Sequence, residues 1–323
     1  MPNNFTPPSP EELNDLLPDY RIDSFLAKGG MGAVYLAKQL KLDREVAIKI
    51  LPKEFGDNPT FRNAFKLEAK AMAKLSHPNL VRIFDFGSID DTLYLVIEYV
   101  PGRTLFDKAH KRKVDMKEAA ILIAEICRGL DHAHRSGLIH RDIKPANILI
   151  DDEARPKIVD FGLARPLDDT HDGGTVYGTK GYTAPEVLRD PHGIDQKADI
   201  FSAGVMLYEL LTGQLVPYPY LSASKLSDSY EDFDVIILKA IHPQRELRYP
   251  HASEMAEELE ALVEKIEAAE SEHQKEQNQP SFLLVTALQP LQLASASSTI
   301  GIPLIALILT LLTTTFLWLV FAF

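Results

Sequence analysis

One stretch, residues 139–162, constrains this chain more than any other: IHRDIKPANILIDDEARPKIVDFG. It contains Asp142, then Asn147, and then Asp160 directly before a Phe-Gly pair. Two short aliphatic runs flank the acidic segment between Asn147 and Asp160, which predicts a hairpin whose buried backbone fixes two polar loops. A carboxylate, an amide and a second carboxylate held in this way can position a hydroxyl group and bind Mg²⁺ on phosphate oxygens.

Length and charge narrow the class of protein. A chain of 323 residues exceeds what one hydrophobic core usually supports, so we expect two packed lobes or domains. The net charge of −12 argues against a nucleic-acid partner. Cys127 is the only cysteine and sits in an apolar run, which predicts a core position. The one basic cluster, Lys108, Lys111, Arg112 and Lys113, is interpreted as a solvated helix face, ahead of a docking site.

The N-terminal part changes character near Tyr20. Residues 1–18 are rich in Pro, Asn and Glu, which predicts a flexible tail with a short helical turn at residues 11–17. From Tyr20 the pattern is strand, turn and strand, and three glycines lie in the turn. Glycines let a backbone lie close over phosphates, with Val34 placed to cover a purine ring, although such a pattern alone fits an ordinary Gly-rich hairpin equally well.

The pattern H-R-D-x-K-x-x-N followed by D-F-G, at this order and spacing, is similar to the catalytic signature of protein kinases. The phrases GGMGAVYLA and HRDIKPANIL resemble the bacterial eukaryotic-like serine/threonine kinases, and the resemblance covers about residues 20–262. It implies an α+β, bilobal kinase fold, with a small β-rich N-lobe on a larger α-helical C-lobe and ATP bound between them.

The resemblance assigns roles to the central stretch. Asp142 would accept or orient the proton of the substrate hydroxyl, and Lys144 would stabilise the transferring phosphoryl group. Asn147 and Asp160 would hold Mg²⁺, or Mn²⁺. Catalysis would then consist mostly of positioning and charge neutralisation.

Two further catalytic positions come from the N-lobe. Lys49 lies in the A-I-K position of a predicted strand and would grip the α- and β-phosphates. Glu68, in a predicted helix at residues 61–75, matches the family's αC glutamate, so the resemblance implies a Lys49–Glu68 ion pair. Two more strands are expected at residues 81–86 and 93–99, separated by the turn GSIDD.

The nucleotide site implied by the resemblance combines the Gly-rich loop, the lysine strand and the hinge between the lobes. Ile97 would be the gatekeeper, and the backbone at Glu98 and Val100 would bond the adenine edge. One departure is Ala27, which stands where the family's first glycine is usual. The full set is Leu26, Ala27, Lys28, Gly29, Gly30, Met31, Gly32, Ala33, Val34, Ala47, Lys49, Ile97, Glu98, Val100 and Leu149.

A polar segment at residues 163–184 follows and is expected to be mobile. Thr175 and Thr170 are its candidate phosphorylation sites, with Thr175 preferred because it lies just before GTKGY. Arg141 would offer a guanidinium partner to such a phosphate. Thr179 and Lys144 together resemble serine/threonine kinases and not tyrosine kinases.

The rest of the C-lobe is predicted to be mostly helical, with a helix at residues 117–137. Asp199 would bond the catalytic-loop backbone, and Arg248 would pair with Glu186 of the A-P-E motif. Between Gly213 and Arg248 the chain is shorter than the family norm, and a loop is expected in place of the αG region.

A Glu-rich helix is expected from residue 252, with apolar residues at alternating spacings of four and three. It is interpreted as the last helix of the lobe, or as a short coiled coil that would make a homodimer.

Residues 300–323 are uncharged and long enough, as a helix, to cross a hydrocarbon layer of about 30 Å. Aromatic residues crowd the far end, as at a membrane interface. The sequence therefore predicts a single-pass membrane anchor, with the kinase lobes in the cytoplasm, where ATP is, and the C-terminus at the far face. The expected division is a tail at 1–18, a kinase domain at 19–266 with lobes at about 19–99 and 100–266, a juxtamembrane linker at 267–299 and a transmembrane helix at 300–323.

Three functions from different classes follow. The first is a membrane-anchored serine/threonine kinase that acts on protein substrates and on itself. The second is a pseudokinase scaffold without turnover, suggested by Ala27 and the shortened region after Gly213. The third, a small-molecule kinase of the same fold, is disfavoured by the A-P-E segment and by Lys144.

Overall fold

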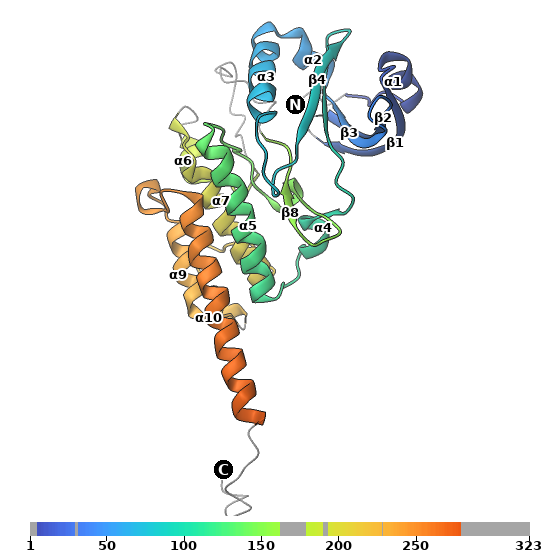
Figure 1. Ribbon diagram of the computed structural model, residues 1–323. Helices are drawn as coiled ribbons and strands as arrows, with labels where there is room; N and C mark the ends of the chain where they lie inside the picture. The colour runs from blue at the N-terminus through green and yellow to red at the C-terminus, as the bar shows by residue number, and fades with distance from the viewer. Residues whose placement is uncertain (1–4, 30–31, 162–178, 190–192, 228, 279–323) are drawn as a thin grey trace, which may run out of the picture. The chain divides into compact units, whose positions relative to one another are not determined.

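The computed structural model describes residues 5–29, 32–161, 179–189, 193–227 and 229–278 (Figure 1). The candidate phosphorylation sites Thr170 and Thr175 lie outside these residues, as do Gly30 and Met31. The predicted transmembrane stretch at residues 300–323 also lies outside them. In the described part, no helix has both the length and the apolar character needed to cross a membrane.

The N-lobe is built on a five-stranded antiparallel sheet with the strand order β1-β2-β3-β5-β4. Its strands are β1 (Tyr20–Gly29), β2 (Gly32–Gln39), β3 (Arg44–Ile50), β4 (Ile83–Ile89) and β5 (Thr92–Glu98). The expected turn GSIDD is shorter in the structure, because Gly87, Ser88 and Ile89 continue the β4 ladder and only Asp90 and Asp91 turn the chain.

Two helices, α2 (Lys53–Asp57) and α3 (Pro59–Met72), follow β3. The Asn58 side chain caps α3 by accepting from the backbone N–H groups of Thr60 and Phe61. Phe61, Phe65, Ala69 and Met72 are buried at intervals of three and four, which gives α3 one apolar face. The helix predicted at residues 61–75 is therefore confirmed, although it begins and ends a few residues earlier.

The second half of the predicted tail is ordered, and the helical turn expected there at residues 11–17 is confirmed as helix α1 (Pro10–Leu16). Ser9 and Glu12 form a capping box at its start, with Pro10 as the first helical residue. Leu13 and Leu17 are buried among the apolar side chains on one face of the five-stranded sheet. The tail is ordered because these leucines cover that face.

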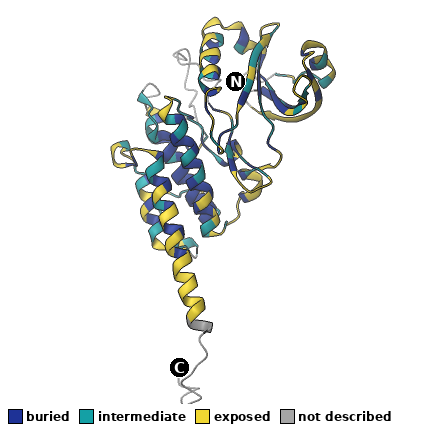
Figure 2. Cartoon of the chain, viewed as in Figure 1, coloured by how far each residue is buried: buried dark blue, intermediate teal, exposed yellow. Residues whose placement is uncertain are grey.

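The C-lobe core lies among long helices, and α7 is buried along almost its whole length (Figure 2). The expected helix at residues 117–137 is confirmed as α5. The C-lobe helices are α4 (Leu105–Ala109), α5 (Met116–Arg135), α6 (Pro185–Arg189), α7 (Lys197–Thr212), α8 (Ala223–Leu226), α9 (Glu231–Ala240) and α10 (Ala252–Asn278), with 3-10 turns η1 (Pro145–Asn147) and η3 (Arg245–Leu247).

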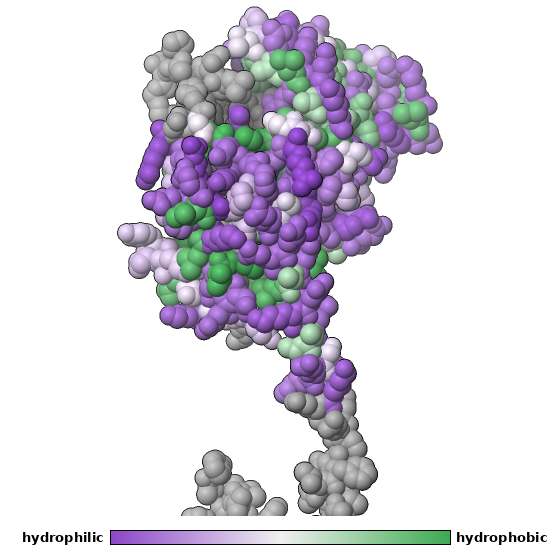
Figure 3. All heavy atoms as spheres, turned by 60° about the vertical axis from the view of Figure 1, so that its left-hand side comes forward, coloured by the Kyte–Doolittle hydropathy of each residue, from purple (hydrophilic) through white to green (hydrophobic). Residues whose placement is uncertain are grey.

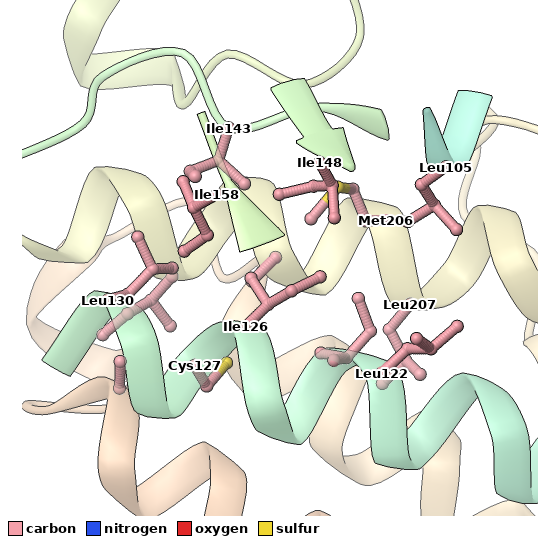
Figure 4. Close-up of a cluster of buried hydrophobic side chains, with 14 of the residues drawn as sticks. Leu105, Leu122, Ile126, Cys127, Leu130, Ile143, Ile148, Ile158, Met206 and Leu207 are labelled. Atoms are coloured by element: carbon pink, nitrogen blue, oxygen red, sulfur yellow. The ribbon is translucent and has the colours of Figure 1, made fainter. Parts of the chain in front are cut away.

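A small three-stranded sheet, ordered β6-β7-β8, contains the middle part of residues 139–162. The strands are β6 (Arg103–Thr104), β7 (Ile148–Ile150) and β8 (Pro156–Ile158), so the predicted hairpin is confirmed. Ile148 and Ile158 point toward α5 and α7, where Cys127 and Met206 lie in the same core (Figure 4). This packing fixes the two polar loops at the ends of the hairpin.

The last helix, α10, begins as expected, and its four apolar positions are buried in the C-lobe core. These positions are Met255, Leu259, Leu262 and Ile266. They favour the last helix of the lobe over a coiled coil for this part of the chain. The helix continues to Asn278, so the expected linker is helical as far as that residue, in keeping with the high helix propensity of its Glu, Ala and Lys residues.

The interpretation of the basic cluster as one helix face is wrong. Lys108 lies in α4, but Lys111, Arg112 and Lys113 lie in the turn before α5, where Lys111 has a positive φ of 56°. Lys108 pairs with Glu118 at 2.6 Å. The chain turns here because α4 ends at Ala109, so the other three cations cannot share a helical face with Lys108.

The region expected to replace αG by a loop has one short helix, α8, among its described residues between α7 and α9. Asp234 in α9 organises it by accepting from the Ala223 backbone N–H at 2.6 Å and from the Tyr220 hydroxyl at 3.2 Å. Val235 and Leu238 of α9 remain exposed. On the face shown in Figure 3, most side chains are hydrophilic and apolar ones gather in a few patches.

Candidate active site

The loop that carries Asp142 is held by a buried carboxylate of α7. Asp199 accepts from the backbone N–H groups of His140 and Arg141, at 2.8 and 2.7 Å, and contacts the His134 ring at 2.8 Å. Burial opposes the charge on Asp199, but His134 and the other donors outweigh it and lower its pKa. Asp199 therefore occupies the place that the resemblance implied.

His140 joins this loop to the strand that leads to Asp160. Its Nδ1 accepts from the Asp142 backbone N–H at 3.2 Å, so its Nε2 carries the proton and donates to the Val159 carbonyl at 2.8 Å. Burial lowers the pKa of His140, against nearby carboxylates that raise it. The sequence analysis missed this residue, although it is the histidine of the H-R-D motif.

Asp142, Lys144 and Thr179 form a triangle of polar contacts. The Lys144 ammonium lies 2.9 Å from Asp142 Oδ2 and donates to Thr179 Oγ1 at 2.8 Å. The Thr179 hydroxyl donates to Asp142 Oδ1 at 3.1 Å. The segment after the undescribed residues 162–178 is thereby joined to the catalytic loop. The Asp142 carboxylate is oriented by Lys144, by Thr179 and by the Asn147 amide, which donates to Asp142 Oδ2 at 3.2 Å.

The two predicted metal ligands lie in linked backbone segments. The Val159 N–H donates to the Asn147 carbonyl at 3.0 Å, one residue before Asp160. The Asn147 amide nitrogen donates to the Asp142 carbonyl at 2.8 Å, so its amide oxygen is not used by that bond. An amide oxygen and a carboxylate are hard donors that suit Mg²⁺, which takes its remaining ligands from phosphates and water. The donor set fits the metal.

Lys49 and Asp160 meet across the two lobes. Lys49 Nζ lies 2.6 Å from Asp160 Oδ1, and the Lys49 side chain is largely buried. Desolvation would raise the pKa of Asp160, but the Lys49 ammonium and other cations outweigh it and lower that pKa. The carboxylate is thus kept ionised, as metal binding requires.

The expected ion pair between Lys49 and Glu68 is not found among the described residues. In that part of the chain, Lys49 makes its salt bridge with Asp160, and Glu68 is a half-buried residue of α3. Lys49 and Asp160 line the same pocket, whereas Glu68 is not among the residues that line it.

Ile97, the expected gatekeeper, lines this pocket, and most of the other lining residues are apolar. Its walls come from β3, α3, β4, β5 and the segment around β8. The lining residues are Lys49, Leu51, Phe65, Met72, Val81, Ile83, Leu95, Ile97, Ile158, Val159, Asp160 and Phe161.

The pairing of β1, β2, β3 and β5 places several of the predicted nucleotide-binding residues side by side. Ala27 pairs with Val34, Val34 with Lys49, and Lys49 with Leu95, so these side chains lie in one row across the sheet. Ala47 pairs with Ile97 in a parallel row. Directly paired residues share one face of a sheet, so both rows face the pocket that contains Lys49.

The Gly-rich turn needs glycine at one described position. Gly32 has a φ of 134°, and a Cβ there would lie 2.0 Å from the Ile50 carbonyl oxygen. A Cβ at Gly29 would meet nothing within 4 Å. Gly32 therefore lets β2 approach the end of β3, whereas Gly29 only borders the turn.

The expected hinge contains Glu98 and Val100. The Glu98 backbone N–H donates to the Arg82 carbonyl at 2.9 Å, so that amide is not available to a nucleotide, and Val100 is buried. Leu149, the last residue of the predicted nucleotide set, lies in β7.

The predicted ion pair between Arg248 and Glu186 is present in the C-lobe. Arg248 donates to both carboxylate oxygens of Glu186, at 2.6 and 2.8 Å, as the resemblance implied.

Comparisons with known proteins agree with this geometry. The family model described as the protein kinase domain matches residues 20–274. Serine/threonine-protein kinase PknB of Mycobacterium tuberculosis is 36% identical over 278 residues, in a match that covers 78% of this chain and 43% of that protein. A probable serine/threonine-protein kinase of Corynebacterium efficiens, CE0033, is 33% identical over 298 residues, covering 82% of this chain and 44% of the relative.

The chain thus spans less than half the length of these curated relatives. The solved PknI kinase domain of Mycobacterium tuberculosis shares the fold, with a TM-score of 0.64 at 24% identity over 75% of this chain and 96% of that one. From the match of the kinase-domain model, the two relatives and the bilobal fold, we conclude that this chain belongs to the protein kinase family.

Proposed function

We propose that this chain is a serine/threonine protein kinase that transfers the γ-phosphate of ATP to serine and threonine hydroxyl groups of proteins. The observation that carries this proposal is the triangle of Asp142, Lys144 and Thr179. It places a carboxylate that can accept a hydroxyl proton beside an ammonium that can neutralise a phosphoryl group.

In the proposed reaction, the substrate hydroxyl oxygen bonds to the γ-phosphorus as the bond to the β–γ bridging oxygen breaks. Asp142 orients the hydroxyl and takes its proton, while Lys144 lies beside the transferring group. Asn147 and Asp160 would hold Mg²⁺, which neutralises phosphate charge when bound. Lys49, which pairs with Asp160 in the structure, would neutralise phosphate charge on the bound nucleotide.

Radiolabel transfer from γ-labelled ATP to a generic basic protein by the full chain tests the proposal. Asp142→Asn keeps the shape of the side chain but removes the proton acceptor, so we expect transfer to fall by about 100-fold or more. Asp152→Asn, an exposed position in the β7–β8 turn, is the matched control and should retain activity. Nucleotide binding by the wild-type chain without any transfer would instead support the pseudokinase scaffold.

Residues 300–323 are proposed as a membrane anchor, supported by their uncharged composition and length. Extraction of cell membranes at high pH should leave the full chain in the membrane fraction. Ile308→Arg places a charge near the middle of the stretch, where it costs about 3 kcal/mol, and should reduce this retention. Complete release of the wild-type chain would contradict the anchor.

Autophosphorylation is proposed at Thr175, with Thr170 as the second site. Both belong to a polar segment that precedes Thr179 in the sequence, and Arg141 of the catalytic loop would offer a guanidinium partner to a phosphate there. Mass spectrometry after incubation with Mg-ATP should find phosphate on one of these residues, and an active enzyme with neither modified would overturn this assignment.

A further inference from the structure

The N-terminal segment at residues 5–17 contacts the N-lobe sheet on the face opposite the nucleotide pocket. Leu13 and Leu17 pack among apolar side chains of β1, β2 and β3 there. The Asn14 side chain accepts from the Ile22 N–H at 2.7 Å, where the β1 register shifts. The helix part of the segment is thus fixed on the sheet, and residues 5–8 run beside the Gly-rich turn.

The first contact near that turn is made by β1. Lys28 directly precedes Gly29, and its ammonium donates to the Phe5 carbonyl at 2.7 Å. The same ammonium lies 5.9 Å from the centre of the Phe5 ring, within the range of a cation–π interaction. One end of the turn is therefore joined to Phe5.

The second contact is made by β2. The Tyr35 hydroxyl donates to the Pro8 carbonyl at 2.6 Å, and the Tyr35 side chain is buried. The Tyr35 ring also packs edge-on against Phe25 of β1, with 5.6 Å between ring centres. Both strands that flank the Gly-rich turn are thus held by one short segment of four residues.

We propose that residues 5–8 are a positioning strap that restricts β1 and β2, the two strands that flank the Gly-rich turn, before a nucleotide binds. A Gly-rich turn loses conformational entropy when it closes over a ligand, and this loss weakens binding. Contacts that restrict the two flanking strands beforehand reduce the loss on binding. The strap therefore raises the affinity for ATP without touching the reacting atoms. The inference rests on the proposed ATP-dependent function.

A pair of hydroxyl deletions tests the strap in the full chain. Tyr35→Phe removes the bond to Pro8 and should raise the KM for ATP and the Kd for ADP about 2- to 10-fold, the value of one hydrogen bond, with kcat within twofold. Tyr20→Phe is the matched control, because it removes a hydroxyl bond to Asp85 from the same apolar cluster. The control should leave both constants unchanged.

A deletion of residues 2–8 provides the second test. It removes Phe5 and Pro8 but retains Ser9, α1 and the buried leucines, so the melting temperature should change by only a few degrees. The KM for ATP should rise by at least as much as in Tyr35→Phe. Unchanged nucleotide constants in both variants, or equal changes in Tyr20→Phe, would overturn the strap. If the wild-type chain bound no nucleotide, the proposed function and the strap would both fail.

Discussion

At the scale of single residues, Thr179 is the contact whose chemistry can be tested most directly. Thr179→Val keeps the shape of the side chain but removes the hydroxyl that joins Lys144 to Asp142. We expect kcat to fall about tenfold or more, because the Asp142 carboxylate loses one of the donors that orient it. Thr179→Ser keeps the hydroxyl and should recover most of the rate in steady-state phosphate-transfer assays. Equal rates in the two variants would contradict this role.

His140 gives a prediction for stability against pH. In the unfolded chain its imidazole takes up a proton near pH 6.5, whereas burial in the folded chain lowers the pKa. The unfolded state thus binds more protons just below pH 6.5, so the free energy of unfolding falls as the pH is lowered there. One group contributes at most about 1.4 kcal/mol per pH unit.

Urea unfolding between pH 8 and pH 5.5 measures this slope. Replacing His140 by Gln removes the titrating group but not the carboxylates around it, Asp142, Asp160 and Asp199, nor the other histidines. The change in the free energy of unfolding with pH should be smaller in this variant than in the wild type, by up to about 1.4 kcal/mol per pH unit, which corresponds to one proton. Identical slopes would show that His140 is not the group responsible.

Sequence alone was sufficient for the residues whose order and spacing define a motif. Roles could be assigned to Asp142, Asn147 and Asp160 because their motifs resemble the kinase signature, and the hairpin between Asn147 and Asp160 was predicted from its aliphatic runs. The partner of Lys49 could not be assigned in the same way. Two carboxylates from distant parts of the chain compete for one ammonium, and which of them is nearer depends on packing that no local pattern encodes.

At the scale of secondary-structure elements, the turn expected at residues 11–17 was found as α1, but its packing on the sheet was not predicted. An isolated helix of seven residues is unstable in water, so the local pattern does not show that this segment is ordered. Its order comes from burial against a sheet face formed by residues later in the chain. Long amphipathic helices such as α5 were predicted well because their own periodicity shows the buried face.

The helix offers a matched pair of leucines for a stability test. Leu13 is 2% exposed and Leu16 is 43% exposed, in the same helix. Leu13→Ala should lower the free energy of unfolding by about 2–5 kcal/mol, because it leaves a cavity over the sheet. Leu16→Ala should change it by no more than about 0.5 kcal/mol. Denaturant titrations compare the two, and similar losses would mean that α1 is not packed as described.

At the scale of the whole molecule, one ion pair joins segments from distant parts of the C-lobe. Arg248 follows η3 and pairs with Glu186 of α6, and it also donates to the His242 and Lys197 carbonyls. Its side chain is completely buried. The family pattern gave the pair, but the two carbonyl contacts that complete the site follow only from the packing of α7 and α9.

Arg248→Met should lower the free energy of unfolding by about 3–5 kcal/mol, because Glu186 is left as a poorly solvated charge. Arg245→Met is the control, since that side chain is 40% exposed and its ion pairs with Asp195 and Glu246 lie near the surface. The control should lose no more than about 1 kcal/mol. Thermal unfolding of both variants tests this, and a milder effect at Arg248 would contradict the description of the pair as buried.

The enclosed thiol of Cys127 has a practical consequence. Burial raises its pKa to about 12, and no other cysteine exists in the chain. A maleimide dye should therefore leave the wild-type chain unlabelled and react completely with a cysteine introduced at an open position such as Leu42. One site-specific fluorophore on each lobe then requires only two such substitutions, and energy transfer between the dyes would report the opening and closing of the nucleotide cleft in solution.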